Sequence, residues 1–261
     1  MKRDLERIAE RVMKAVRALP EGFNRGTEVR QGADGTPTTN IDEVAEDEIL
    51  SCVTEMDLPL NVLSEEAGFV DRGMEETLVI DPIDGTNNAV MGLPFFSVSL
   101  ALGRRSISDV RMGLVRNLVT GETYFAEKGN GAYKDGERLR VREYDPNCLL
   151  FLIYMGKYAS EKTIKVIRRA ERARSLGCAS LEMCLVAEGM MDAYYMNCER
   201  YDKSIRVVDI AASALILREA GGELLDLSGD RLDLPFDLVP RSNFAAIGSP
   251  KVAEVILRNS D

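Results

Sequence analysis

The spacing of apolar residues predicts two amphipathic helices in the first part of the chain. Apolar side chains recur every three or four positions until Pro20 ends the pattern, at Leu5, Ile8, Val12, Val16 and Leu19. The same spacing returns at Ile41, Val44, Ala45, Ile49 and Cys52. The polar, glycine-rich segment RQGADGTPTTN (30–40) separates the two patterns, and we interpret it as a mobile loop.

Short apolar runs and alternation predict strands in the rest of the chain. LNVLSEEAG (60–68) and TLVIDPIDGT (77–86) each indicate a strand that ends on acidic residues. Residues 97–141 alternate with period two and contain Asn130-Gly131 and Asp135-Gly136, which is typical of an antiparallel meander. Further strands are expected at 149–155, 192–196, 223–227 and 245–248, and helices near 160–173, at 178–189, from about 205 to Gly221-Gly222, and near the end of the chain.

Mixed runs of strands and helices indicate a layered α and β structure. We expect an α+β half with the meander, residues 1–145, joined to an alternating α/β half, residues 146–261. A length of 261 residues is compatible with one large domain or with two closely packed halves.

Composition narrows the possible partners and chemistries. The net charge of −10 argues against nucleic acid or an anionic membrane as the main partner. The chain has no histidine, which excludes Ser-His-Asp triads and histidine-based zinc sites. The five cysteines form no CxxC pair and indicate reduced core residues. Because the charged N-terminus is unlike a signal peptide and no apolar run could span a bilayer, we expect a soluble cytoplasmic protein.

The stretch LVIDPIDGTNNAV (78–90) carries the most specific chemistry. Hard cations such as Mg²⁺ prefer oxygen ligands, and Pro82 fixes the backbone so that Asp81, Asp84 and the Ile83 carbonyl can converge. Gly85 allows close approach of a ligand, and the amides of Thr86 and Asn87 begin a helix, where phosphate binds well. The stretch therefore predicts a metal site joined to a phosphate site.

Each acidic residue also has a purely structural interpretation. Asp42 lies three residues after Thr39 and could complete a helix cap. Glu65 and Glu66 could belong to a solvated loop, and Asp209 could complement a helix dipole. Asp81 and Asp84 could form an Asx-turn.

Four elements in one order carry a family resemblance. Asp42, Glu65-Glu66, DPIDGT (81–86) and DIAA (209–212) together resemble the lithium-sensitive, Mg²⁺-dependent phosphatase superfamily. The likeness is greatest to inositol monophosphatases and to the archaeal-type enzymes that also act on fructose 1,6-bisphosphate. It includes MCLVAEGMMDAYY (183–195) and the archaeal-type loop GADGTPTTNID (32–42).

The resemblance implies a set of roles for residues of this chain. Two or three Mg²⁺ ions would be bound by Glu65, Asp81, Asp84, Asp209 and the Ile83 carbonyl. Catalytic roles are implied for Asp42, Glu65 and Thr86, with Thr86 and Asp42 orienting the attacking water. Phosphate or substrate contacts are implied for Asp84, Gly85, Thr86, Asn87, Arg174, Ala179, Arg200 and Arg206. The implied fold is the sugar-phosphatase α/β/α/β/α sandwich, assembled as a homodimer.

The sequence departs from the family at several positions. Val208, Ser213 and Ser64 replace a tryptophan and two glycines that are usual there, but none of these positions supplies a ligand. Met196 stands where animal inositol monophosphatases have a glutamate that contacts inositol, and the segment NCERYDKSIR (197–206) is longer. These two differences argue against inositol 1-phosphate as the main physiological substrate.

The predicted function is Mg²⁺-dependent hydrolysis of phosphate monoesters of small polyols and sugars, namely inositol 1-phosphate and fructose 1,6-bisphosphate, by metal-activated water. Arg174, Arg200 and Arg206 are either solvated surface charges or donors to a second phosphate. Within the superfamily, the alternatives are a 3′-phosphoadenosine-type nucleotide phosphatase and an NADP phosphatase. From another class, the alternative is a cation- or phosphate-binding regulator without turnover.

Overall fold

The computed structural model describes residues 1–33 and 35–258 of the chain. The helices are α1 (Lys2–Arg17), α2 (Asn40–Glu55), α3 (Thr86–Met91), α4 (Lys162–Ile167), α5 (Ala179–Ala187), α6 (Val207–Glu219) and α7 (Pro250–Leu257). Short 3₁₀ turns, η1 and η2, lie at Ile107–Asp109 and Tyr201–Lys203. None of these helices has both the length and the apolar character that crossing a membrane requires.

Two larger sheets and one hairpin contain the strands. The hairpin pairs β1 (Glu28–Gln31) with β2 (Pro37–Thr39). The eight-stranded sheet has the order β10-β9-β8-β7-β6-β5-β3-β4, with strands β3 (Leu60–Ser64), β4 (Gly68–Val70), β5 (Glu76–Asp84), β6 (Ser97–Gly103), β7 (Met112–Asn117), β8 (Thr123–Glu127), β9 (Gly131–Lys134) and β10 (Glu137–Arg138). The five-stranded sheet has the order β12-β11-β13-β15-β14, with strands β11 (Leu150–Ile153), β12 (Arg172–Arg174), β13 (Ala193–Met196), β14 (Glu223–Leu225) and β15 (Phe244–Ile247).

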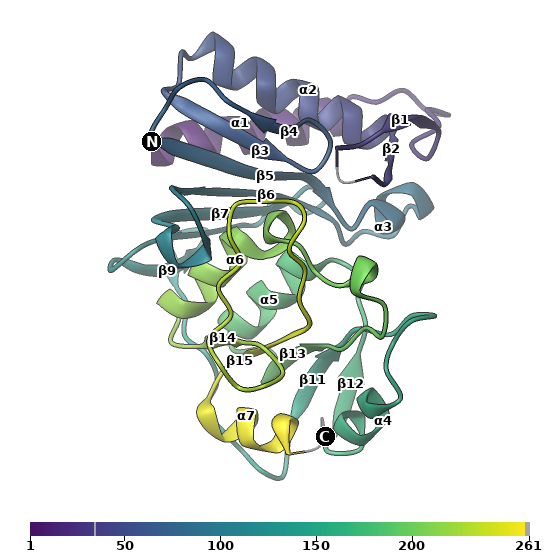
Figure 1. Ribbon diagram of the computed structural model, residues 1–261, viewed down its shortest axis with the longest axis vertical. Helices are drawn as coiled ribbons and strands as arrows, with labels where there is room; N and C mark the ends of the chain where they lie inside the picture. The colour runs from purple at the N-terminus through teal and green to yellow at the C-terminus, as the bar shows by residue number, and fades with distance from the viewer. Residues whose placement is uncertain (34, 259–261) are drawn as a thin grey trace.

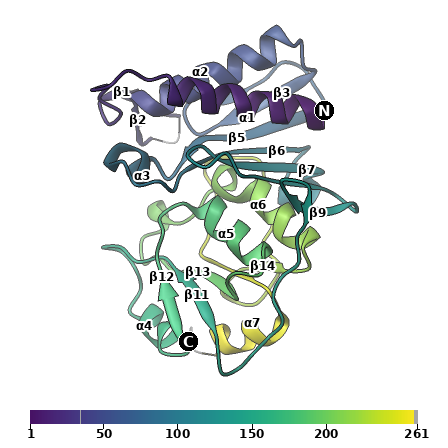
Figure 2. The ribbon, with the colours of Figure 1, turned by 180° about the vertical axis from the view of Figure 1, so that it is seen from behind.

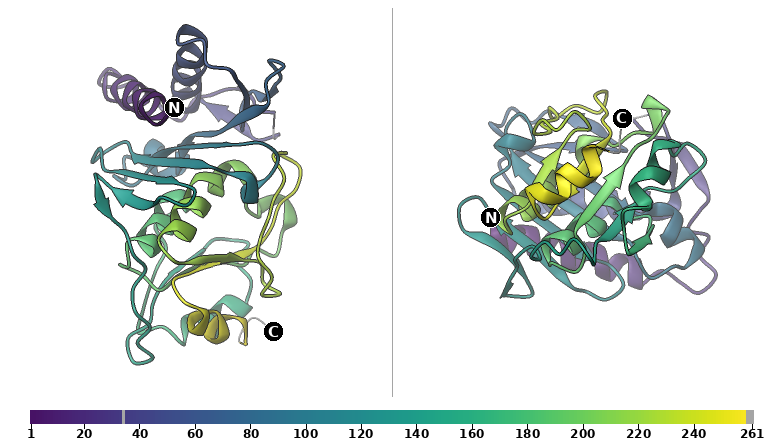
Figure 3. Two further views of the ribbon diagram at one scale, coloured as in Figure 1. Left: turned by 90° about the vertical axis from the view of Figure 1, so that its left-hand side faces the viewer. Right: turned by 90° about the horizontal axis from the view of Figure 1, so that it is seen from below.

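Helices and sheets alternate in five layers. Helices α1 and α2 cover one face of the eight-stranded sheet, and α5 and α6 lie between the two sheets (Figure 1). Helices α4 and α7 cover the outer face of the five-stranded sheet, as the view from behind also shows (Figure 2). The side view separates the layers most clearly (Figure 3). The predicted α/β/α/β/α sandwich is therefore confirmed.

Successive side chains of a strand point to opposite faces of the sheet, so they pack into different hydrophobic clusters. Leu78 and Ile80 of β5 face the cluster beneath α1 and α2, whereas Val79 faces the central cluster. Strands β6 to β9 pair with their neighbours antiparallel, which confirms the predicted meander. The central helix α6 is buried on nearly all sides, as expected of a helix enclosed between two sheets.

The end of α6 also follows the sequence prediction. Gly221 has a φ of +100°. The Gly222 N–H donates to the Leu217 carbonyl at 2.9 Å and the Gly221 N–H to the Arg218 carbonyl at 3.0 Å. This is the hydrogen-bond pattern of a glycine-terminated Schellman motif.

Two sequence predictions were wrong in part. The helix expected over 160–173 ends at Ile167, and residues 172–174 form β12 instead. The reason is tertiary: the Glu171 N–H donates to the Leu149 carbonyl at 2.8 Å, and β12 pairs with the edge of β11. The loop expected over 30–40 is largely the β1–β2 hairpin, although Asp34 lies outside the described residues.

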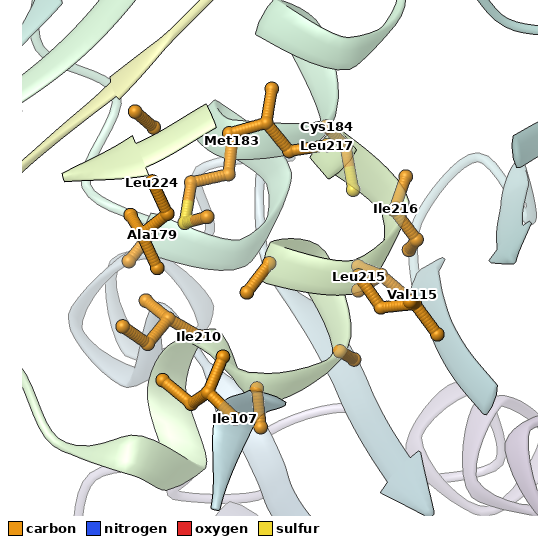
Figure 4. Packing of buried hydrophobic residues seen from close by; sticks show 14 of the residues in the cluster. Ile107, Val115, Ala179, Met183, Cys184, Ile210, Leu215, Ile216, Leu217 and Leu224 are labelled. Atoms are coloured by element: carbon orange, nitrogen blue, oxygen red, sulfur yellow. The ribbon is translucent and has the colours of Figure 1, made fainter. Parts of the chain in front are cut away.

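Close packing between α6 and β7 depends on small residues. Side chains of α5 and α6 meet the eight-stranded sheet in the central cluster, where Leu215 lies beside Val115 (Figure 4). A Cβ atom placed on Gly113 would lie 2.6 Å from the Ala212 carbonyl oxygen. Because that neighbour is backbone, a side chain here would force the helix away from the sheet.

We expect Gly113→Ala to lower the free energy of unfolding by about 1–3 kcal/mol through overpacking. Gly156→Ala is the matched control, because Gly156 is exposed and a Cβ there would meet only the end of the Tyr154 side chain and no backbone atom. Urea unfolding of the two variants and the wild type measures the effect. An unchanged midpoint for Gly113→Ala would contradict the close contact.

Candidate metal and phosphate site

Three acidic side chains from separate elements meet at one edge of the eight-stranded sheet. Glu65 follows β3, Asp81 lies near the end of β5, and Asp209 is in the first turn of α6. Strands β3 and β5 are parallel neighbours, with Ser64 opposite Ile80, so their carboxyl ends reach the same edge. One carboxylate oxygen from each acid lies within 4.8 Å of the other two. We call Glu65, Asp81 and Asp209 the acidic cluster.

The acidic cluster concentrates negative charge in a buried place. Asp81 is only 3% exposed. Burial raises the pKa of its carboxyl well above the usual value, and the charges of Asp84, Glu65 and Asp209 raise it further. An all-carboxylate donor set with unbalanced charge fits a hard divalent cation. The structure therefore brings these acids together as a candidate metal site.

Arg206 supplies the positive charge that faces this cluster. Its Nη1 donates to Glu65 Oε1 at 2.5 Å, and its Nη2 donates to Asp209 Oδ1 at 2.8 Å. Burial opposes the charge on this guanidinium, but Asp209 and Glu65 raise its pKa well above the usual value. Sequence analysis assigned Arg206 to substrate contact, whereas in the structure its guanidinium donates to two carboxylates of the acidic cluster.

Asp84 is held by the start of α5. Its carboxylate accepts hydrogen bonds from the Ser180 N–H at 2.6 Å, the Ser180 hydroxyl at 2.5 Å and the Ala179 N–H at 3.2 Å. The Cys178 thiol donates to the same carboxylate at 3.1 Å. Burial raises the pKa of Asp84, whereas the Ser180 and Cys178 hydrogen bonds lower it. Ala179, a predicted substrate contact, thus reaches Asp84 through its backbone.

Thr86 and Asp42 lie together, and Asp42 also caps its helix. The Thr86 hydroxyl oxygen lies 2.9 Å from the Ile83 carbonyl oxygen and 3.1 Å from Asp42 Oδ1, so its one proton can be donated to either acceptor. The other Asp42 oxygen accepts the Thr39 N–H at 3.0 Å and the Thr39 hydroxyl at 2.6 Å, completing a capping box at the start of α2. The two interpretations of Asp42 are therefore compatible.

Gly85 is required by the fold of the predicted phosphate loop. Its φ is +87°, and a Cβ there would lie 3.1 Å from the Cys178 Cβ and 3.2 Å from the Gly177 carbonyl oxygen. The space beside Gly85 that sequence analysis reserved for a ligand is therefore partly filled by the chain itself. Asn87 follows Thr86 on the exposed side of α3.

The other two arginines of the prediction, Arg174 and Arg200, contact other parts of the chain. Arg174 is exposed, and its Nη1 donates to the Ala173 carbonyl at 2.8 Å. Arg200 is exposed, forms a two-point ion pair with Asp202, and lies 5.0 Å from the centre of the Tyr158 ring. Met196 is 4% exposed in the central core, which suits an apolar residue at that position.

Sequence reasoning missed three supporting residues. Asn88 Nδ2 donates to the carbonyls of Phe95 and Leu176, both at 2.7 Å, and so ties α3 to the loop before α5. The Glu182 carboxylate, whose pKa burial raises to about 7, accepts the Leu176 N–H at 2.9 Å. Ser180 holds Asp84. Asn88 lies two residues after the DPIDGT motif, but nothing in the sequence showed that these polar groups face one another.

Cys178 also differs from its sequence interpretation. The five cysteines are free thiols, and four of them are buried. Cys178 is nevertheless more than core filling, because its thiol contacts the Asp84 carboxylate and the Ser97 hydroxyl.

Comparison with known proteins agrees with this geometry. The model of the inositol monophosphatase family matches residues 2–260. A fructose-1,6-bisphosphatase/inositol-1-monophosphatase of Methanothermobacter thermautotrophicus is 35% identical over 97% of this chain and 93% of its own. A bifunctional NADP phosphatase/NAD kinase of Methanococcus maripaludis is 35% identical over 88% of this chain and 44% of its own.

Solved structures give the same result. The crystal structure of an inositol monophosphatase-fructose 1,6 bisphosphatase superposes with a TM-score of 0.87 at 32% identity, covering 99% of this chain and 98% of the other. The resemblance predicted from the DPIDGT and DIAA motifs is confirmed. This chain belongs to the inositol monophosphatase family of phosphoric monoester hydrolases.

Proposed function

We propose that this protein hydrolyses phosphate monoesters of small polyols and sugars with Mg²⁺, and that fructose 1,6-bisphosphate and inositol 1-phosphate are substrates. The observation that carries the proposal is the acidic cluster, whose oxygens lie within 4.8 Å of one another beside the Gly85-Thr86 loop. The names of the archaeal relatives support the choice of substrates.

The proposed ligands of the ions are Glu65, Asp81, Asp84, Asp209 and the Ile83 carbonyl. Bound Mg²⁺ would supply Lewis acidity toward the phosphoryl group and lower the pKa of water without any histidine. The Thr86 hydroxyl would orient an attacking water, and its hydrogen bond to Asp42 supports this role. Asp84 is fixed by four donors at the start of α5, so its position needs little reorganisation.

One second candidate is favoured by a specific finding. The 35% identity to a bifunctional NADP phosphatase/NAD kinase supports NADP as a rival substrate. A panel of fructose 1,6-bisphosphate, inositol 1-phosphate, NADP and 3′-phosphoadenosine compounds, each with Mg²⁺, separates the candidates. A preference for NADP would replace the sugar and polyol assignment.

We expect hydrolysis to require Mg²⁺ at about millimolar concentration, and Asp81→Asn to lower kcat at least about a hundredfold. The matched control is Asp71→Asn, in the exposed turn before β5, which should keep full activity. Steady-state kinetics with thermal melts distinguishes lost chemistry from lost folding. Full activity of the wild type in excess EDTA would refute the metal requirement.

We expect Thr86→Ala to lower kcat much more than it raises KM, because its hydroxyl would act on water rather than on the ground-state substrate. The control is Thr39→Ala, which removes the capping partner of Asp42 but keeps the contact with Thr86. That variant should lose about 1 kcal/mol of stability and retain most of its turnover. Equal losses of kcat in both variants would contradict a specific role for the Thr86 hydroxyl in orienting water.

We expect Arg200→Ala to raise KM for fructose 1,6-bisphosphate about tenfold to a hundredfold and to change KM for inositol 1-phosphate much less. The reason is that this exposed guanidinium could exchange its ion pair with Asp202 for a second phosphate, which only the bisphosphate has. Lys203→Ala, at the residue directly after Asp202, controls for the loss of one exposed positive charge. Equal losses on both substrates would mean that Arg200 serves the shared phosphate or the fold.

A further inference from the structure

The contact of Arg206 with the acidic cluster is unusual for a residue beside a cation site. Its guanidinium reaches Glu65 Oε1 at 2.5 Å and both oxygens of Asp209, at 2.8 Å from Nη2 and 3.2 Å from Nε. The side chains of Arg206, Glu65 and Asp209 are 12%, 17% and 10% exposed. The planar guanidinium thus connects two members of the acidic cluster at a position from which most solvent is excluded.

This guanidinium places its positive charge against the oxygens that a cation would use. The two carboxylates that it contacts share the acidic cluster with Asp81, so one guanidinium faces a group of three acidic side chains. Arg206 is therefore the internal counter-charge of the cluster. A charge-assisted, forked pair of this kind is among the stronger side-chain interactions.

We propose that Arg206 competes with the divalent cation for Glu65 and Asp209 and so sets the metal affinity of the site. The proposal rests on the metal site of the proposed function and goes beyond it. In the metal-free protein the arginine neutralises the acids and keeps them close together. Its contacts with Glu65 and Asp209 must be given up when those oxygens accept a cation.

A merely supporting role for Arg206 predicts the opposite change in metal affinity when the arginine is removed. If the arginine only held the two acids in position, its removal would leave them disordered and weaken metal binding. If Arg206 competes, then after its removal the cation no longer has to displace the guanidinium from Glu65 and Asp209, and metal binding becomes tighter. The backbone N–H of Arg206 donates to Asp209 Oδ2 at 2.8 Å and would remain after side-chain substitution. That contact still positions Asp209 at the start of α6.

The test is isothermal titration calorimetry of metal-free protein with Mn²⁺ at pH 8. Arg206→Gln should bind Mn²⁺ about tenfold to a hundredfold more tightly than the wild type, the range expected for loss of a charge-assisted pair. The matched control is Arg111→Gln, which removes a guanidinium paired with Glu76 at 2.5 and 2.7 Å, away from the acidic cluster. Its Mn²⁺ affinity should equal that of the wild type.

A second variant and a second measurement cover the case in which Arg206→Gln does not fold. Arg206→Lys keeps the charge but lacks the planar fork, so it should tighten Mn²⁺ binding by a smaller factor. In the wild type, the ¹⁵N signal of Arg206 Nε should be protected from exchange without metal and should shift on saturation with Mg²⁺.

The outcomes separate the two proposals. Absence of Mn²⁺ binding to the wild type at the acidic cluster would overturn the proposed metal site itself. Mn²⁺ binding by the wild type with unchanged or weaker affinity in Arg206→Gln would overturn only the competition. An Arg206 Nε signal that does not change with Mg²⁺ would also overturn it.

Discussion

The structure is organised around buried like charge at the ends of two parallel strands. Glu65 and Asp81 lie at the carboxyl ends of β3 and β5, and Asp209 joins them from α6. Bringing carboxylates this close costs free energy, because burial and then the charges of Asp84, Glu65 and Asp209 raise the pKa of Asp81. A cation is needed, and the chain supplies one of its own in Arg206.

The layered fold keeps this arrangement in place. Helix α6 is enclosed between the two sheets, so Asp209 in its first turn cannot drift from the end of β5. Helix α5 adds four donors to Asp84, and Asn88 ties the loop before α5 to α3. The residues that hold the carboxylates thus come from segments about a hundred positions apart, such as Asp84 and Ser180.

Local patterns allowed much of this to be predicted from the sequence. The spacing of Leu5, Ile8 and Val12 indicated α1, and the alternation after Ser97 indicated the meander, because each depends on one element and the face that it buries. The helix predicted over 160–173 was too long, because pairing of its last residues with β11 outweighed their local helical preference. The acids were found because their residue types and order are distinctive. The contacts of Ser180, Asn88 and Arg206 were not found, since they depend on side chains that meet only after folding.

The central claim is that the acidic cluster is a metal site whose internal counter-charge is Arg206. Anomalous diffraction from crystals equilibrated with Mn²⁺ tests it most directly. The account predicts an anomalous peak bounded by Glu65, Asp81 and Asp209, with the Arg206 guanidinium no longer within hydrogen-bond distance of Glu65. No peak at these carboxylates, with Arg206 still bridging Glu65 and Asp209 at saturating Mn²⁺, would contradict it.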